Sequence, residues 1–114
     1  MKIDHYKFGE IVIDGQAYNR DLLILADRVA TGWWRGEGHK LALADLDEAL
    51  ADPPQVLVVG TGRYGRMSVP AQTRQALAAQ GVELVSRPTK AACQTYNEMA
   101  SAGKRVVAAL HLTC

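Results

Sequence analysis

The chain has 114 residues, of which 48% are hydrophobic and 22% are charged; this suits one folded domain, spanning residues 1–114, and is too short for separate cofactor and substrate domains. Thirteen basic and twelve acidic residues leave a net charge of +1, so no overall field favours nucleic acid as a partner. No apolar stretch reaches the ~20 residues of a transmembrane helix, and the start MKIDHYKFGE lacks the apolar segment of a signal peptide, so we expect a cytoplasmic protein.

The first third of the chain predicts short antiparallel strands. Asp14-Gly15 separates the apolar runs 11–13 and 16–18, and Asp-Gly in this position is a strong hairpin signal because glycine accepts a positive φ. The run DLLILA at 21–26 predicts a buried strand, and GWWR at 32–35 predicts a further one.

A short helix follows, and the pattern then changes to alternating strands and helices. Asp45, with Glu48 three residues later, is expected to be the N-cap of this helix, which ends at Pro53-Pro54. The later elements are expected as strands at 56–59, 82–86 and 106–112, with helices at about 69–80 and 89–102. Alternation of this kind implies right-handed crossovers and parallel strands.

The strand compositions predict an order in the parallel sheet. The first and third strands are continuously apolar, as expected for strands covered on both faces, whereas Glu83 lies inside the second. The order second, first, third sends the two helices to opposite faces. It also places a topological switch point at the carboxyl end of the first strand. The fold class is therefore α/β, with a mixed sheet, an N-terminal antiparallel hairpin and a βαβαβ parallel core.

A glycine-rich loop, VVGTGRYGRM, lies at that switch point. Gly60, Gly62 and Gly65, with Thr61 after the first glycine, have the spacing G-x-G-x-x-G. In dinucleotide-binding proteins these glycines let the backbone approach the pyrophosphate at a helix N-terminus.

Two departures argue against a dinucleotide cofactor. Pro70 delays the helix and leaves Ser68 as the expected N-cap. The second strand ends in Ser86-Arg87-Pro88, where an acidic residue would bind the ribose. We therefore predict no cofactor.

A less specific site at the same edge remains open. Parallel topology would bring Arg63 and Arg66 of the loop close to Arg87, beside helix starts capped by Ser68 and Thr89. Such an edge would bind an anion or a protein partner. The alternative is that the glycines only permit a tight turn and the arginines are solvated.

Cys93 and His111 allow a nucleophile-and-base interpretation. Cys93 falls in the first turns of a predicted helix, and His111 ends the last strand at the same edge. The alternative is that Cys93 packs against the sheet and His111 is a hydrogen-bonded core residue. The three histidines have no ligand-like spacing, so no metal site is predicted, and Cys93 and Cys114 are expected to be free thiols.

The stretch GWWRGEGHKL at 32–41 is a second candidate surface. Adjacent strand residues face opposite sides, so if Trp33 packs inward, Trp34 points outward beside Arg35. Exposed tryptophan and arginine are frequent anchors of protein interfaces. The alternative is that both rings are buried under the helices.

Five blocks of the sequence resemble the adipogenesis-associated domain-containing proteins. The blocks are FGEIVIDGQAY, WWRGEGHKL, VLVVGTGRYGRM, PTKAACQTYNEM and RVVAALHLTC. This family consists of small, largely uncharacterised one-domain proteins and includes a mitochondrial assembly factor for respiratory complex I. The resemblance spans nearly the whole chain and implies a three-layer α/β fold; it implies no catalytic residues, cofactor or substrate.

Two functional hypotheses follow from different classes. In the first, a non-catalytic accessory or assembly protein, with a possible link to maturation of a membrane or respiratory complex, binds a protein partner through the glycine-loop edge and the Trp34/Arg35 surface. In the second, a small enzyme or ligand-binding protein holds an anion or nucleotide with Arg63, Arg66 and Arg87, and Cys93 or His111 supplies chemistry. A homodimer is compatible with either hypothesis.

Overall fold

The computed structural model describes residues 1–114 and contains eight β-strands, three α-helices and one 3-10 helix. The strands form a three-stranded sheet, β1-β2-β3, and a five-stranded sheet, β5-β4-β8-β6-β7. The strands are β1 (Ile3–Lys7), β2 (Glu10–Ile13), β3 (Gln16–Tyr18), β4 (Leu22–Ile24), β5 (Val29–Thr31), β6 (Val56–Thr61), β7 (Glu83–Arg87) and β8 (Val106–His111). The helices are η1 (Leu43–Leu46), α1 (Asp47–Leu50), α2 (Ala71–Ala79) and α3 (Thr89–Ser101).

The parallel core has the order predicted from strand composition. β6 pairs in parallel with β7 on one side and with β8 on the other, so that Val58 aligns with Val85 and with Ala108. Every residue of β6 and β8 is buried, whereas both ends of β7 are exposed. β4 pairs antiparallel with β8, and β5 pairs antiparallel with β4, which makes the sheet mixed. The α/β fold class with a mixed sheet is thereby confirmed.

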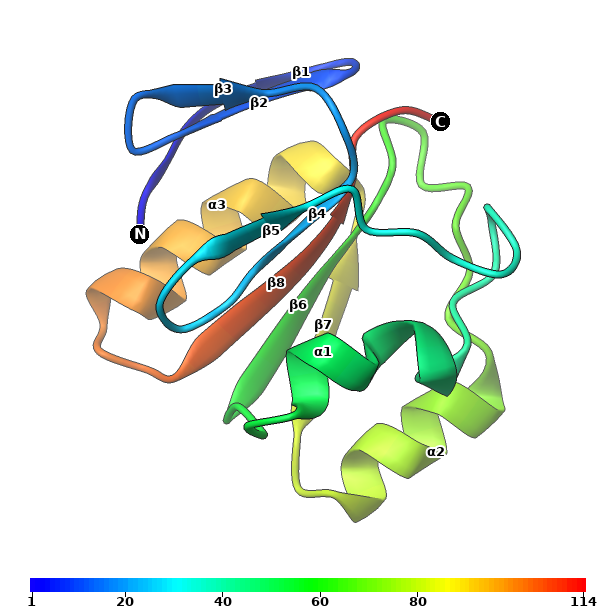
Figure 1. Ribbon diagram of the computed structural model, residues 1–114. Helices are drawn as coiled ribbons and strands as arrows, with labels where there is room; N and C mark the ends of the chain where they lie inside the picture. The colour runs from blue at the N-terminus through cyan, green and yellow to red at the C-terminus, as the bar shows by residue number, and fades with distance from the viewer.

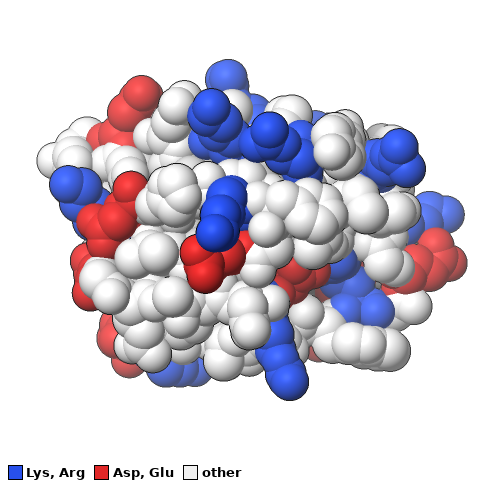
Figure 2. Space-filling model, turned by 90° about the horizontal axis from the view of Figure 1, so that it is seen from above, with Lys and Arg blue, Asp and Glu red and all other residues white.

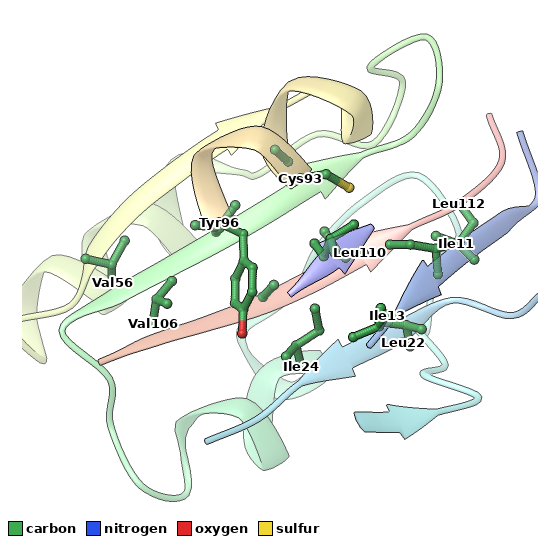
Figure 3. Close-up of a cluster of buried hydrophobic side chains, with 14 residues drawn as sticks. Ile11, Ile13, Leu22, Ile24, Val56, Cys93, Tyr96, Val106, Leu110 and Leu112 are labelled. Carbon is green, nitrogen blue, oxygen red and sulfur yellow. The ribbon is translucent and has the colours of Figure 1, made fainter. Parts of the chain in front are cut away.

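The helices cover opposite faces of the five-stranded sheet and complete three layers (Figure 1). One hydrophobic cluster contains α3 side chains and the inward-facing residues of the three-stranded sheet, called the small sheet from here on. The other cluster contains side chains of η1, α1 and α2. Figure 3 shows Cys93 and Tyr96 of α3 within the first cluster, together with side chains from both sheets. The small sheet and α3 therefore share one face.

The N-terminal hairpin forms at the predicted turn. β2 and β3 are antiparallel, and Asp14 and Gly15 between them have φ values of 48° and 81°, as a tight primed turn requires. β1 pairs with β2 on the other side and makes a third strand.

The expected strand at 32–35 is wrong. The strand at this point, β5, ends at Thr31, and Gly32 has a φ of 78°. This left-handed residue turns the chain away from the sheet edge. The N–H groups of Gly32 and Trp33 both donate to the backbone oxygen of Asp21, at 3.0 and 2.9 Å.

The helix caps expected at Asp45 and Ser68 are also wrong. Asp45 lies inside η1, and its carboxylate accepts hydrogen bonds from the N–H groups of Ala42 at 2.9 Å and Gly36 at 3.2 Å. Ser68 does not cap α2, because the N-cap is Pro70, which is extended with φ −60° and ψ 156°. The proline ring disfavours the helical region for the preceding residue, Val69, so the helix cannot begin before Pro70.

Candidate functional site

The glycine loop leaves the carboxyl end of β6, as predicted from its position in the sequence. Gly60 and Thr61 are the last residues of β6 and are buried. Gly62 has a φ of 102° and Gly65 has a φ of 68°, so both occupy backbone conformations that favour glycine. The loop then runs toward α2.

The protein's own C-terminal segment fills the space beside this loop. A Cβ atom on Gly62 would lie 2.8 Å from the backbone oxygen of Thr113 and 2.9 Å from that of Cys114. The N–H of Arg63 donates to the Thr113 oxygen at 2.7 Å, and the N–H of Gly62 donates to the Thr89 hydroxyl at 2.9 Å. These donors are therefore already bonded within the chain, in contrast to a phosphate cradle.

Gly60 lets α3 approach the sheet closely. A Cβ atom there would lie 2.9 Å from both Leu110 Cδ2 and Thr89 Oγ1. Thr89 is the first residue of α3 and, contrary to expectation, does not cap it, because the N-cap is Pro88. Its hydroxyl instead donates to the His111 backbone oxygen at 2.6 Å. The first glycine and Thr89 thus join helix, loop and strand.

The three predicted arginines lie at this end of the sheet. Arg63, Arg66 and Arg87 are exposed, and none forms a salt bridge within the chain. A Cβ atom on Gly65 would lie 3.5 Å from the Pro88 ring, which places the loop beside the end of β7. Figure 2, the view from above Figure 1, shows several basic side chains along its upper margin.

Exposed aromatic side chains lie at the same end. Trp34 is 81% exposed, Tyr64 is 67% exposed and Phe8 is 52% exposed. The Arg66 guanidinium lies 5.9 Å from the Tyr64 ring centroid, and Phe8 precedes Gly9, whose N–H donates to the Leu112 oxygen. We call Trp34, Arg63, Tyr64, Arg66 and Arg87 the carboxyl-edge surface. Tyr64 was missed by sequence reasoning, although it lies between the two loop arginines.

Arg35 does not belong to this surface. Its side chain is 6% exposed, and its Nη2 atom lies 3.0 Å from Asp21 Oδ2 and 3.1 Å from His111 Nδ1. Its Nε donates to the Gly38 oxygen at 3.1 Å, and its guanidinium lies 4.7 Å from the centroid of the half-buried Trp33 ring. The guanidinium therefore ties the loop after β5 to the end of β8.

Asp21, Arg35 and His111 form the most concentrated polar cluster of the interior. His111 Nδ1 lies 2.7 Å from Asp21 Oδ2, and the N–H of Leu112 donates to Asp21 Oδ1 at 2.8 Å. Arg35 Nη1 and His111 Nε2 are buried without a hydrogen-bond partner in the protein. Asp21 was not singled out from the sequence; an acidic residue at the start of a buried strand was the available signal.

The surroundings of Asp21 favour its ionised form. Burial acts to raise the pKa of its carboxyl group, but the hydrogen bonds from His111 and Leu112 and the nearby Arg35 lower it. The net pKa lies below the ordinary value of 3.8. The carboxylate thus balances the buried Arg35 charge.

Cys93 and His111 lie on opposite faces of the sheet. Cys93 shares its cluster with Leu110 and Leu112, and alternation along β8 directs His111 to the other face. Burial raises the pKa of the Cys93 thiol to about 12. The two side chains therefore do not form a nucleophile-and-base pair in this arrangement.

The surface hollows lie elsewhere. The largest, about 520 Å³, lies between the loop after Arg35 and the start of α2. A groove of about 400 Å³ between β1 and α3 is lined by Cys93 together with Tyr6 and Lys90. None of the five hollows is lined by residues 60–66.

His, Cys, Asp and Glu side chains form no group of three or more able to hold a metal ion. No helix has the length and apolar character needed to cross a membrane.

Solved structures with the same fold match the chain along nearly its whole length. PH1505 from Pyrococcus horikoshii, a conserved hypothetical protein, is 31% identical with a TM-score of 0.87, and the match covers 100% of both chains. Rpa2829 from Rhodopseudomonas palustris is 34% identical with a TM-score of 0.77, covering 95% of this chain and 80% of that one. A Mth938-like domain from Bordetella pertussis is 26% identical with a TM-score of 0.73, covering 97% of this chain and 85% of that one.

The family comparison agrees with these structures. Residues 3–111 match a family described as protein of unknown function, DUF498/DUF598. The expectation of a small uncharacterised family is thus confirmed, whereas the adipogenesis-associated name is not shown by these matches. The chain belongs to the DUF498/DUF598 family.

Proposed function

We propose that this protein is a non-catalytic accessory or assembly protein that binds a protein partner through the carboxyl-edge surface. The observation that carries the proposal is the exposure of Trp34, 81%, at the same end of the sheet as arginines that form no internal salt bridge. Of the four exposed large hydrophobic side chains, Trp34, Tyr64 and Phe8 lie at this end. Apolar side chains gathered with arginines are typical of protein interfaces.

The filled glycine loop supports this proposal over a nucleotide site. The C-terminal segment occupies the position that a phosphate would need beside Gly62, while the loop's side chains Arg63 and Tyr64 face solvent. The loop therefore presents side chains rather than backbone donors to a partner.

We propose that the protein binds this partner in the cytoplasm. The resemblance to the adipogenesis-associated proteins supports a partner that matures within a membrane or respiratory complex.

Affinity capture from native lysate tests the proposal. W34A and the double variant R63E/R66E should each lose the same set of captured proteins, because both remove parts of one surface. R105E is the matched control, since Arg105 is an exposed arginine just before β8, at the opposite end of that strand. If both surface variants recover the same captured proteins as the wild type, the proposal is contradicted. Direct binding of each captured protein to purified wild type and to W34A separates specific from adventitious capture.

A second candidate, binding of a small anion, is favoured by one observation. Arg35 Nη2 and His111 Nδ1 both contact Asp21, but Arg35 Nη1 and His111 Nε2 are buried and have no partner in the protein. A buried charged donor such as Arg35 Nη1 normally has a partner. Thermal unfolding with phosphate, sulfate, nucleotides and CoA esters tests it. A ligand at ~100 times its Kd should add ~2.7 kcal/mol of stability, and no shift with any of them contradicts this candidate.

A further inference from the structure

Strand β7 is an outer strand with an open backbone edge. It pairs in parallel with β6 from Glu83 to Arg87, and the sheet order places no strand on its other side. Such an edge presents unpaired N–H and C=O groups that can template a further strand. The edge therefore needs either protection or a partner.

The middle of β7 is held in place by packing on both faces. Leu84 contacts the cluster on the α2 side of the sheet, and Val85 contacts the cluster on the α3 side. Glu83 and Arg87, at the two ends, are exposed, and neither forms a salt bridge within the chain. The strand is thus a fixed segment with an unpaired charge of opposite sign at each end.

We propose that β7 pairs antiparallel with β7 of a second copy of this chain, in a register centred on Val85. In a two-fold symmetric antiparallel pair, residues equally distant from the centre face each other. Glu83 of each copy then faces Arg87 of the other, and Leu84 faces Ser86. The pairing joins two five-stranded sheets into one continuous sheet and forms the same Glu–Arg pair twice.

The sequence of β7 favours a second copy over an unrelated strand. The segment ELVSR is complementary to itself in charge only when it is paired antiparallel about its central residue. The opposite edge strand, β5, has the sequence VAT and no charge with which to select a partner or a register. Directly opposed strand residues of opposite charge stabilise pairing, and like charges oppose it.

The dimer does not depend on the proposed partner surface. Because the two-fold axis of such a pair is perpendicular to the sheet, the strands of the two copies run in opposite directions and their carboxyl edges lie at opposite ends of the joined sheet. Arg87 is the one residue that belongs to both the carboxyl-edge surface and the β7 edge. Glu83 lies at the amino end of β7, so its substitution leaves the partner surface intact.

Sedimentation velocity of the full chain tests the pairing, from about 1 µM to about 500 µM so that weak association is covered. The wild type should form dimers as its concentration rises. E83R and R87E each place like charges opposite one another at two positions and should raise the dimer Kd about tenfold or more. The double variant E83R/R87E restores opposite charges at both positions and should return the Kd to about the wild-type value.

An equimolar mixture of E83R and R87E gives the sharpest test. Each variant alone is self-repelling, whereas their heterodimer has opposite charges at both pairs, so the mixture should associate more strongly than either variant. R105E, at the other end of the molecule, should dimerise as the wild type does. A wild type that stays monomeric at every concentration overturns the proposal and identifies the two charges as edge protection. A dimer whose Kd is unaffected by the single charge reversals also overturns the proposal, because it must form through another surface.

Circular dichroism of every variant tests whether the variant is folded, so that altered association can be separated from unfolding. Failure of this proposal is distinguishable from failure of the proposed function. E83R should lose dimerisation yet still capture the partner protein, whereas W34A should lose the partner yet still dimerise.

Discussion

Asp21 joins segments that are far apart in the sequence. Its carboxylate contacts Arg35 in the loop after β5, and it accepts hydrogen bonds from His111 and Leu112 near the end of the chain. Burying an arginine without an opposite charge is costly, so the position of Arg35 depends on this single carboxylate. A residue that looked ordinary in the sequence thus organises the polar interior.

Asp21→Asn should lower the free energy of unfolding by about 3 kcal/mol at pH 7, because it leaves the buried Arg35 without a counter-charge. The pKa of Asp21 is lower in the folded protein than its ordinary value of 3.8. Its ionised form therefore contributes stability above that pH, and this contribution is lost as the pH falls through the folded pKa. The difference between wild type and variant in urea unfolding should narrow below about pH 4. D27N, which changes an exposed carboxylate, is the control. If D27N lowered the free energy of unfolding at pH 7 as much as Asp21→Asn does, this account would be contradicted.

The two thiols should differ in reactivity. Cys93 is buried with a pKa raised to about 12, whereas Cys114 is half-buried, and only the thiolate reacts with alkylating reagents. Iodoacetamide at pH 8, followed by peptide mass spectrometry, should modify Cys114 and spare Cys93 in the native protein. In denaturant both should react. Equal labelling rates in the native state would show that the α3 face opens readily.

Among the elements, the contact between α3 and β6 depends on the absence of one side chain. Gly60 lies near the end of β6, and a Cβ atom there would meet both Thr89 and Leu110. Because Thr89 also bonds the Gly62 N–H and the His111 oxygen, it has little freedom to move. The first glycine of the loop is therefore required by packing within the chain.

Gly60→Ala should destabilise the protein by about 2 kcal/mol, because the added methyl group overpacks a rigid contact. Gly36→Ala is the matched control, since a Cβ atom there meets nothing within 4 Å and the residue does not have a positive φ. It should change stability by less than about 0.5 kcal/mol. Urea unfolding measures both, and a Gly60→Ala protein as stable as the wild type would show that α3 can shift.

For the molecule as a whole, both hydrophobic clusters depend on the same central strands. Val58 and Ala108 belong to the cluster on the α3 side, and Val59 and Ala109 belong to the cluster on the α2 side. Alternation along β6 and β8 thus makes each strand part of both clusters. Loss of either cluster should expose the other.

Leu57→Ala and Leu110→Ala test whether the chain unfolds as a single domain. Leu57 lies in the α2-side cluster and Leu110 in the α3-side cluster, and both are fully buried. Each variant should lose about 2–5 kcal/mol and keep one transition, with tryptophan fluorescence coinciding with far-UV circular dichroism. Two separate transitions would show that the single-domain prediction is wrong.

The predictable part of the fold follows from local signals. Asp14-Gly15 specifies a hairpin because few residues adopt its backbone angles. Continuous apolar runs identify β6 and β8 as central strands, and Glu83 identifies β7 as an edge, because a charge is tolerated only where water can reach it. The caps expected at Asp45 and Ser68 are wrong because Asp45 lies inside η1, where its carboxylate bonds the N–H groups of Ala42 and Gly36, and because Pro70 is the N-cap of α2.

The sequence by itself determined the order of the parallel strands, the hairpin and the end of the sheet at which the loop arginines lie, since these depend on hydrophobic pattern and chain direction. Tertiary structure alone decided what each side chain does there. It buried Arg35 against Asp21 and His111, left Trp34 and Tyr64 exposed, and filled the glycine loop with the chain's own C-terminal segment. These outcomes depend on contacts between segments up to 91 residues apart, and local propensity holds no information about such contacts.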